Sequence, residues 1–463
     1  MRAMTLLAKL GGSLPERYYL GLDIGYREHV AVVIPLQVFV EGGDRWRRVR
    51  CLHFASTSAG LAKFQAYLDR HSVDAKQFLG LCEPTGGCYG AATYQYLLSR
   101  GYAMWMVENT ATRDMRLKLM PNLPKTDEME ARVMARMGYL HEAVGEEFTL
   151  RSLKLANPDD AELLALCRDQ WKLNGMICRA RNQFGQMMAI VFPELKTFFT
   201  DSVSTPVPVA LIAAYPTPAD LAAASAAEVR EVLRQARGHR HAARVEELQE
   251  LARHSSGLLP DPGRAWRLRW LTEFIQSNNA HLIDLERRIV LTLQQREAYH
   301  LLVDIPYAGP ASLGMILAAT RDAGRFGNYR QYVAYSGYYA GLETSQTIDR
   351  TRMSKRGNRD LKRALFQIAS PLVWFDRTDN PYKELYERKR AEGRPWYKAM
   401  PFACAALARH IYHCLKSGER YDVEKVFKRP LMAPASETVP VDLMASLEER
   451  FEVMDAHLTL LED

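Results

Sequence analysis

The sequence predicts an α/β plus α chain, in which an N-terminal α/β domain is followed by a largely helical region. Two observations lead to this prediction. Apolar runs typical of strands alternate with helical patterns up to about residue 150, whereas the pattern is helical from about residue 158 onward. The chain has 463 residues, which is enough for roughly two to four domains with cores of their own.

The N-terminal strands are predicted by short apolar runs bounded by turn residues. We expect two strands within residues 17–36, joined by a turn near Gly25, and a third strand from Arg47 to Phe54. Further on we expect a helix at 58–71, a strand at 77–83, a helix at 89–100, a strand at 102–107 and a helix starting near Asp127. Three adjacent strands followed by strand–helix alternation indicate an RNase H-like sheet.

The helical region is predicted to contain two long helices, Asp159 to Ile190 and Arg264 to Glu297, around short helices and Pro-rich turns at 206–257. Such a pair suggests a protruding antiparallel coiled coil or an intermolecular one. Residues 305–310 (Ile-Pro-Tyr-Ala-Gly-Pro) resemble a helix–hairpin–helix, whose glycine turn lets backbone N–H groups approach a phosphate.

The domain boundaries are predicted from these changes of pattern. We expect an α/β domain at 1–150, long helices with an insert (about 200–257) at 151–300, a C-terminal domain at 301–425, and a linker with an amphipathic helix at 426–463. The last helix packs on the protein's own body or on a partner, and its apolar stripe consists of Leu443, Leu447, Phe451, Met454, Leu458 and Leu461.

Composition narrows the possible functions. The formal net charge of +7 permits nucleic-acid binding. The seven cysteines form no CxxC pair and no HExxH motif occurs, which argues against a zinc site or a disulfide framework. No run of about 18 apolar residues is present, so we expect no membrane span and a reducing, cytoplasmic compartment.

Four carboxylates stand at positions that a mixed sheet could bring together. Asp23 and Glu83 each follow an apolar run, and Asp127 and Glu130 share one face of the predicted helix. A carboxylate at the end of a buried strand is costly unless it is paired or binds a metal. Four acids suit one or two hard cations such as Mg²⁺, whereas the alternative is four unrelated caps or surface groups.

These motifs resemble the DEDD transposases of insertion sequences, a family of bridge-RNA-guided recombinases. The first block is Gly21-Leu22-Asp23, Glu83-Pro84-Thr85-Gly86 and the run from Lys125 to Arg132, and it resembles the family's RuvC-like domain of RNase H fold. The second block is residues 305–310, Tyr335-Ser336-Gly337, Glu343-Thr344-Ser345 and the run from Arg352 to Asn358, and it resembles the family's C-terminal transposase domain.

The resemblance implies an activity and its residues. Asp23, Glu83, Asp127 and Glu130 would bind Mg²⁺ or Mn²⁺, although the family usually has Asp at the last position. Ser345 matches the serine nucleophile and lies in an expected polar loop from Glu343 to Arg350. Gln346 follows where the family has Gly, so Thr344 and Ser354 remain alternatives.

The resemblance also implies partners and a location. The partners are DNA (element ends and target), a non-coding guide RNA and further copies of the chain in a dimer or tetramer, with an active site shared between protomers. The location is the bacterial or archaeal cytoplasm, in association with the nucleoid.

A dense basic cluster follows Ser345. Seven basic residues stand against one acid, Asp360, within residues 350–363, and they could neutralise several phosphates of DNA or RNA. These residues are Arg350, Arg352, Lys355, Arg356, Arg359, Lys362 and Arg363.

Other functions compete with this one. A RuvC-like resolvase would cut DNA with metal-activated water and would need neither Ser345 nor the basic cluster. A non-catalytic nucleic-acid-binding scaffold would have no reason to keep all four acidic positions. Residues 22–25 also resemble the first phosphate loop of sugar kinases and actin-like ATPases, but no second Gly-rich phosphate loop follows.

Overall fold

The computed structural model describes residues 16–84, 88–120, 124–154, 157–200, 202–257, 262–345, 348–353, 357–378 and 380–427, with the backbone alone at 340–345 and 348–353. The chain forms two compact units, the N-terminal unit Met1–Ala156 and the C-terminal unit Asn157–Asp463. A further division of the C-terminal unit into middle and C-terminal domains stays a prediction.

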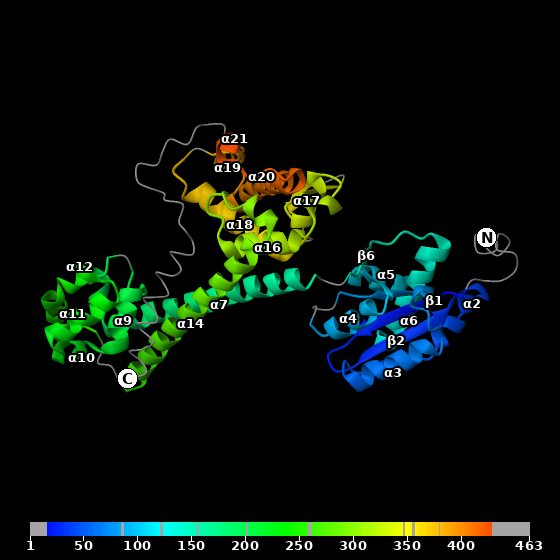
Figure 1. Cartoon of the computed structure of the whole chain (residues 1–463), viewed down its shortest axis with the longest axis horizontal. Coiled ribbons are helices and arrows are strands. Elements are labelled where there is room, and N and C mark those ends of the chain that lie inside the picture. The colour runs from blue at the N-terminus through cyan, green and yellow to red at the C-terminus, as the bar shows by residue number, and fades with distance from the viewer. Residues whose placement is uncertain are drawn as a thin grey trace. The chain divides into compact units, whose positions relative to one another are not determined.

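The N-terminal unit is built on a six-stranded mixed sheet with strand order β3-β2-β1-β4-β5-β6. Strands β1, β2 and β6 are labelled in Figure 1. The strands are β1 (Tyr18–Ile24), β2 (His29–Pro35), β3 (Leu52–Phe54), β4 (Phe78–Cys82), β5 (Ala103–Val107) and β6 (Leu150–Ser152). Strand β2 is antiparallel to both its neighbours, β1 and β3. Strands β1, β4 and β5 are parallel, and β6 is antiparallel to β5. This mixed sheet fits the RuvC-like domain expected from the sequence.

Both faces of the sheet are covered because successive side chains of a strand point to opposite faces. One face packs on α3 (Ser58–Asp69) and α4 (Ala91–Ser99). The other packs on α2 (Leu36–Val40), α5 (Asn109–Leu119) and α6 (Asp127–Tyr139). Short turns of helix complete the unit, namely η1 (Arg45–Arg48), η2 (Ala75–Gln77) and η3 (Leu140–Val144).

Three local features differ from the expected elements. The third strand begins at Leu52, because the residues expected to open it form the 3₁₀ turn η1 around the buried Trp46. Helix α5 and strand β6 were not expected. Helix α5 is mostly polar, with Thr112 and Met115 as its buried residues, and β6 has three residues, so neither has a strong periodic signal.

The C-terminal unit is organised by two long helices that lie side by side, α7 (Pro158–Val191) and α14 (Pro262–Gln294) (Figure 1). Both were expected within a few residues. The helices of the insert share a hydrophobic core with parts of α7 and α14. These insert helices are α8 (Leu195–Phe198), α9 (Pro206–Ala214), α10 (Pro218–Ala223), α11 (Ala226–Gln235), α12 (His239–Ala242) and α13 (Val245–Arg253). A coiled coil between chains stays a prediction.

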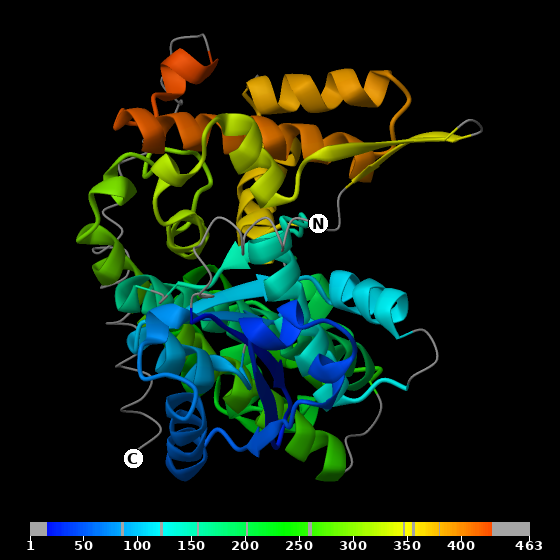
Figure 2. The ribbon, with the colours of Figure 1, turned by 90° about the vertical axis from the view of Figure 1, so that its right-hand side faces the viewer.

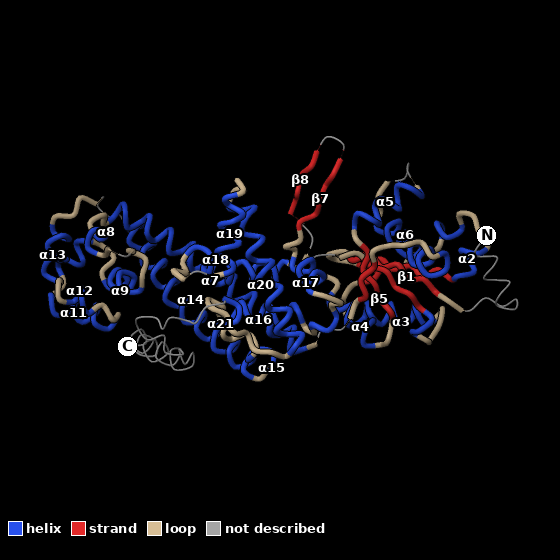
Figure 3. The backbone as a smooth tube through the Cα atoms, turned by 90° about the horizontal axis from the view of Figure 1, so that it is seen from above, coloured by secondary structure: helices blue, strands red, loops and turns tan. Residues whose placement is uncertain are grey.

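The remaining helices pack around α16 (Pro310–Thr320), which is buried from Ala311 to Thr320. They are α15 (Glu297–His300), η4 (Ala323–Arg325), α17 (Tyr329–Ser336), α18 (Arg359–Trp374), α19 (Pro381–Ala391), α20 (Trp396–Ser417) and α21 (Val423–Phe427). Between α17 and α18 the antiparallel hairpin of β7 (Ala340–Ser345) and β8 (Ile348–Met353) extends away from the helices (Figures 2 and 3).

Two expected features of this region stay predictions. Gly309 is the N-cap of α16 and the preceding helix α15 has four residues, but a helix–hairpin–helix that binds phosphate is not established by this arrangement. The amphipathic helix expected within 426–463 lies outside the described residues, apart from the end of α21. None of the helices in the described ranges is long and apolar enough to cross a membrane.

Candidate active site

The register of β1 and β4 places Asp23 beside Glu83. The last parallel pair is Leu22 with Cys82, and Asp23 and Glu83 are the next residues of the two chains. Tyr19 on β1 is four residues before Asp23, and Leu81 on β4 is two residues before Glu83. Both belong to the core that packs on α6. Because side chains alternate, both carboxylates are directed to the α6 face of the sheet.

Helix α6 brings two further carboxylates to the same end of the sheet. Its N-cap is Thr126, whose hydroxyl accepts a hydrogen bond from the Met129 N–H at 3.2 Å. Asp127 and Glu130 lie in the first turn, where the positive end of the helix dipole favours acidic side chains. Asp127 is exposed and Glu130 is buried, so this end of the sheet opens to solvent at Asp127.

The acids interact electrostatically. Burial raises the pKa of Asp23 to about 6, and repulsion from Asp127, Glu83 and Glu130 adds to the shift while Lys125 opposes it. Burial also raises the pKa of Glu83, while the neighbouring Thr112 hydroxyl lowers it and repulsion from Glu130 adds to the rise. Asp127, Glu83 and Glu130 therefore lie close enough to Asp23 to affect its pKa.

Glu130 has a protein partner that the sequence analysis missed. Its Oε1 lies 2.9 Å from Nε of Arg116 on α5, and the two side chains are 4% and 12% exposed. The guanidinium compensates the buried carboxylate, as a metal ion would. The residues around Arg116 on the polar helix α5 give no sign in the sequence that its side chain pairs with Glu130 on α6.

The donor set fits a divalent cation in charge and chemistry. Asp23, Glu83 and Asp127 supply oxygen ligands in a half-buried region where their mutual repulsion would be relieved by a cation. Within the described parts of the chain, however, no group of three or more His, Cys, Asp or Glu side chains is arranged to hold a metal ion. Metal binding by these residues therefore remains a proposal.

Glu128, between the two predicted ligands of α6, has a different role. His53 on β3 contacts Glu128 through Nε2 and Glu28 through Nδ1, both at 3.1 Å. Hydrogen bonding to Glu128 and Glu28 raises the pKa of His53. Arg132 donates to Glu128 at 2.8 Å. These contacts tie the start of α6 to the antiparallel edge of the sheet.

Ser345 lies on a hairpin and not in the expected loop. The backbone pairs Glu343 with Arg350, Thr344 with Asp349 and Ser345 with Ile348, which makes Ser345 the last residue of β7. The expectation of a loop was wrong because cross-strand pairing, and not local polarity, determines this segment. Ser354, an alternative nucleophile, lies outside the described residues.

The predicted phosphate-binding residues are divided between the hairpin and α18. Arg350 and Arg352 belong to β8, whereas Lys355 and Arg356 lie outside the described residues. The other three, Arg359, Lys362 and Arg363, occupy the first turns of α18.

The acid within this stretch is neutralised. Asp360 forms an ion pair with Arg168 on α7, in which Nη2 of Arg168 lies 2.5 Å from Oδ2 of Asp360. Asn358 caps α18 by accepting hydrogen bonds from the N–H groups of Asp360 and Leu361, both at 3.0 Å. The first turns of α18 are therefore capped and carry an excess of positive charge, because Arg168 neutralises Asp360 while Arg359, Lys362 and Arg363 keep their charges.

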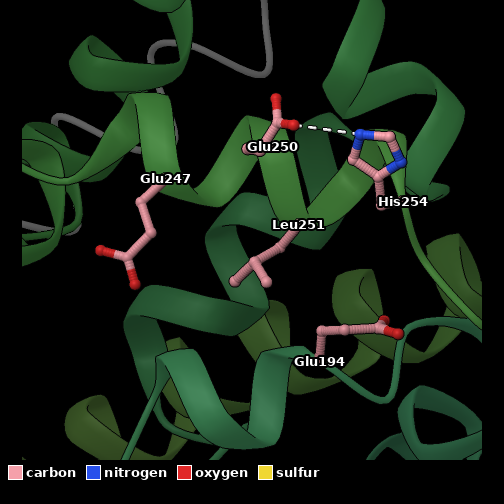
Figure 4. A pocket seen from close by; sticks show the side chains of 5 residues that line it. All are labelled: Glu194, Glu247, Glu250, Leu251 and His254. Atoms are coloured by element: carbon pink, nitrogen blue, oxygen red, sulfur yellow. Dashed lines mark ion pairs between the residues drawn. The ribbon is translucent and has the colours of Figure 1, made fainter.

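An acidic hollow of the insert is not a second candidate. Glu194, Glu247 and Glu250 line it together with Leu251 and His254 (Figure 4). Each carboxylate has a protein donor, since Glu250 pairs with His254 at 3.0 Å, Arg244 donates to Glu247 at 2.7 Å, and the Ser255 hydroxyl donates to Glu194 at 2.7 Å.

Two family models match this chain. The DEDD transposase model of the IS110 type matches residues 20–193, which include all of the sheet except the first two residues of β1, and all four acids. The model described as transposase IS116/IS110/IS902 family matches residues 299–387, which include the hairpin and the basic cluster. No curated protein matches the chain. The fold and the matches define a transposase, a protein that acts on DNA. The chain belongs to the IS110 family of DEDD transposases.

Proposed function

We propose that this transposase cuts and rejoins DNA through a phosphoserine intermediate. Ser345 is the nucleophile, and Asp23, Glu83, Asp127 and Glu130 bind Mg²⁺ or Mn²⁺. The observation that supports the proposal most is the electrostatic effect of the other three acids on Asp23, because burial and the neighbouring carboxylates raise its pKa to about 6. Such accumulated negative charge is typical of sites that bind hard cations.

The proposed reaction conserves the energy of the phosphodiester bond. The Ser345 hydroxyl oxygen attacks the phosphorus and loses its proton, while the bond to the leaving sugar oxygen breaks and that oxygen takes up a proton. A hydroxyl oxygen of another strand then attacks the phosphorus and loses its proton, while the bond to the serine oxygen breaks and that oxygen takes up a proton, so rejoining needs no ATP. When bound, the cation supplies charge stabilisation at the attacking and leaving oxygens.

The basic residues position the nucleic acid in this proposal. Arg350, Arg352 and the cations of α18 contact phosphates of DNA or of a non-coding guide RNA. The ion pair between Arg168 and Asp360 supports this role, because it removes the one negative charge of the stretch. A guide RNA and a homo-oligomer are proposed from the family resemblance.

The decisive experiment traps the covalent intermediate. The purified chain is incubated with DNA ends of its element, the guide RNA and Mg²⁺, and the products are analysed by denaturing electrophoresis and peptide mass spectrometry. We expect a phosphate-linked nucleotide on Ser345, which Ser345→Ala eliminates. Thr344→Ala is the matched control and should keep the adduct. An adduct on Thr344 or Ser354 would reject Ser345 as nucleophile.

A second candidate function is a resolvase that cuts with metal-activated water. It is favoured by the fact that the four acids belong to one compact unit, which could cut without the serine. The same experiment separates the two functions. Cleavage that needs Asp127 but leaves no adduct, and that persists in Ser345→Ala, would establish the resolvase.

A further inference from the structure

Four aromatic side chains gather where the end of α18 meets the start of α20. The ring of Trp374 lies 6.1 Å from that of Phe366 and 5.9 Å from that of Trp396, and Trp396 lies 6.0 Å from Tyr397, with each pair edge to face. Trp374, Trp396 and Tyr397 are 45%, 50% and 57% exposed. We call Phe366, Trp374, Trp396 and Tyr397 the aromatic platform.

Of the four platform rings, Phe366 packs against the core, whereas Trp374, Trp396 and Tyr397 do not belong to it. Helix α18 already buries Leu365, Ile368 and Leu372, and α20 buries Met400 and Leu407. The exposed aromatic rings lie outside this packed side. Contiguous exposed apolar surface of this kind marks an interaction site, because leaving it in water is unfavourable.

A hollow beside the platform indicates the chemistry of its ligand. It has a volume of about 270 Å³, and Lys362, Phe366, Trp396 and Tyr397 line it together with Tyr338. Nζ of Lys362 lies 5.4 Å from the centre of the Tyr338 ring. The side chains that line the hollow in the described chain include this cation and no carboxylate. Aromatic walls with one cation suit a flat base attached to a phosphate.

We propose that the aromatic platform stacks unpaired bases of single-stranded DNA and that Lys362 contacts a backbone phosphate. Bases within a duplex are already stacked on one another, so the platform would select unpaired nucleotides. Strand β7, which carries Ser345, begins at Ala340, close in sequence to Tyr338. The inference rests on the proposed function, since a transposase that exchanges strands exposes unpaired nucleotides near its nucleophile.

The test measures binding of fluorescein-labelled oligonucleotides to the full chain by anisotropy. The probes are a thymidine-rich single strand, the matching duplex and an RNA of the same sequence. We expect Trp396→Ala and Trp374→Ala each to weaken single-strand DNA binding roughly ten-fold or more, with little effect on the duplex. Trp396→Phe should retain most of the affinity, because it keeps an aromatic face.

The matched control is Trp266→Ala on α14, since Trp266 is 67% exposed and lies outside the platform. It should leave all three affinities unchanged. Equal losses for Trp266→Ala, or unchanged single-strand affinity in the platform variants, would overturn the proposal. A loss confined to the RNA probe would reassign the platform to RNA and overturn the DNA assignment. A change of sedimentation coefficient with unchanged affinity would assign the surface to a second copy of the chain.

These results are separable from the proposed function. If the platform variants lose single-strand binding while no phosphoserine adduct forms in the wild type, the platform stands and the proposed reaction fails. If the adduct forms normally and platform variants bind single strands as tightly as the wild type, the platform alone fails. Circular dichroism of Trp374→Ala and Trp396→Ala should match the wild type.

Discussion

Gly21 on β1 and Ala131 on α6 are in backbone contact, since a methyl group on Gly21 would lie 1.8 Å from the Ala131 carbonyl oxygen. No side chain therefore separates the helix from the strand. This contact sets the depth at which α6 lies on the sheet and so the approach of Asp127 and Glu130 to Asp23.

We predict that Gly21→Ala destabilises the N-terminal unit by at least about 1–3 kcal/mol, the usual cost of overpacking. The displaced helix should also abolish metal-dependent cleavage. Gly185→Ala in α7 is the matched control, because its added methyl group would meet Val203 at an ordinary 3.9 Å. That helix substitution should instead stabilise the chain by about 0.5–1 kcal/mol. Chemical denaturation measures both values, and equal stability of wild type and Gly21→Ala would contradict the role of this contact.

The fold was predictable where the signal is local. Strands β1, β2, β4 and β5 are apolar runs, and both long helices have sustained apolar periodicity, so each was expected near its observed bounds. Strand β6 was missed because it is short and is stabilised by pairing with β5, which is distant in sequence. The hairpin of β7 and β8 was missed because its strands pair across a turn and have no alternating apolar pattern.

The candidate site was predictable in part for the same reason. Asp23 and Glu83 end apolar strands, and Asp127 and Glu130 begin a helix, so their positions could be inferred from neighbouring residues. The interaction of Glu130 with Arg116 could not, because it depends on how α5 packs against α6. Nothing around Arg116 distinguishes it from the exposed Arg113 on the same helix.

The stability of the N-terminal unit should depend on pH and Mg²⁺ through Asp23. Its pKa is about 6 in the folded chain against an ordinary value of 3.8, so the folded chain holds the proton more tightly. The resulting stabilisation is fully present below pH 3.8 and is lost as the pH rises through about 6. Asp23→Asn mimics the protonated state and should therefore melt above the wild type at pH 8 without Mg²⁺, with the gap closing toward pH 5.

With Mg²⁺ at pH 8 the wild type should instead melt above Asp23→Asn. The cation binds the folded wild type and raises its Tm, whereas the Tm of Asp23→Asn should be nearly unchanged. Differential scanning fluorimetry with and without EDTA measures both effects. Asp114→Asn, at a side chain that is 66% exposed on α5, is the control and should behave as the wild type. An equal Mg²⁺ response in wild type and Asp23→Asn would contradict the metal site.

Arg116 should be essential for stability when no metal is bound. Arg116→Met leaves the buried Glu130 carboxylate uncompensated, which should cost about 3–5 kcal/mol. The double variant Arg116→Met/Glu130→Met should recover most of this loss, because both charges are removed together. Arg113→Met is the control, and its 65% exposed side chain should contribute less than about 1 kcal/mol.

The same variant tests Glu130 as a ligand. If Glu130 binds the cation, Mg²⁺ should restore part of the Tm lost in Arg116→Met, because the freed carboxylate gains a positive partner. If Mg²⁺ does not restore the stability of Arg116→Met, Glu130 pairs with Arg116 and does not bind the cation. Asp23, Glu83 and Asp127 would then be the three remaining predicted ligands.

The cations at the start of α18 should determine how binding of duplex DNA depends on salt. Each phosphate contact that is lost should lower the slope of log K against log salt concentration by about one unit. We therefore expect Arg359→Ala and Arg363→Ala each to reduce the slope by about one and to weaken binding equally for unrelated DNA sequences, measured by anisotropy across a KCl series. Arg253→Ala is the matched control, because Arg253 is 51% exposed but pairs with Glu250 at 2.6 Å on α13. Equal slopes for wild type and Arg359→Glu would show that this turn of α18 faces solvent and not DNA.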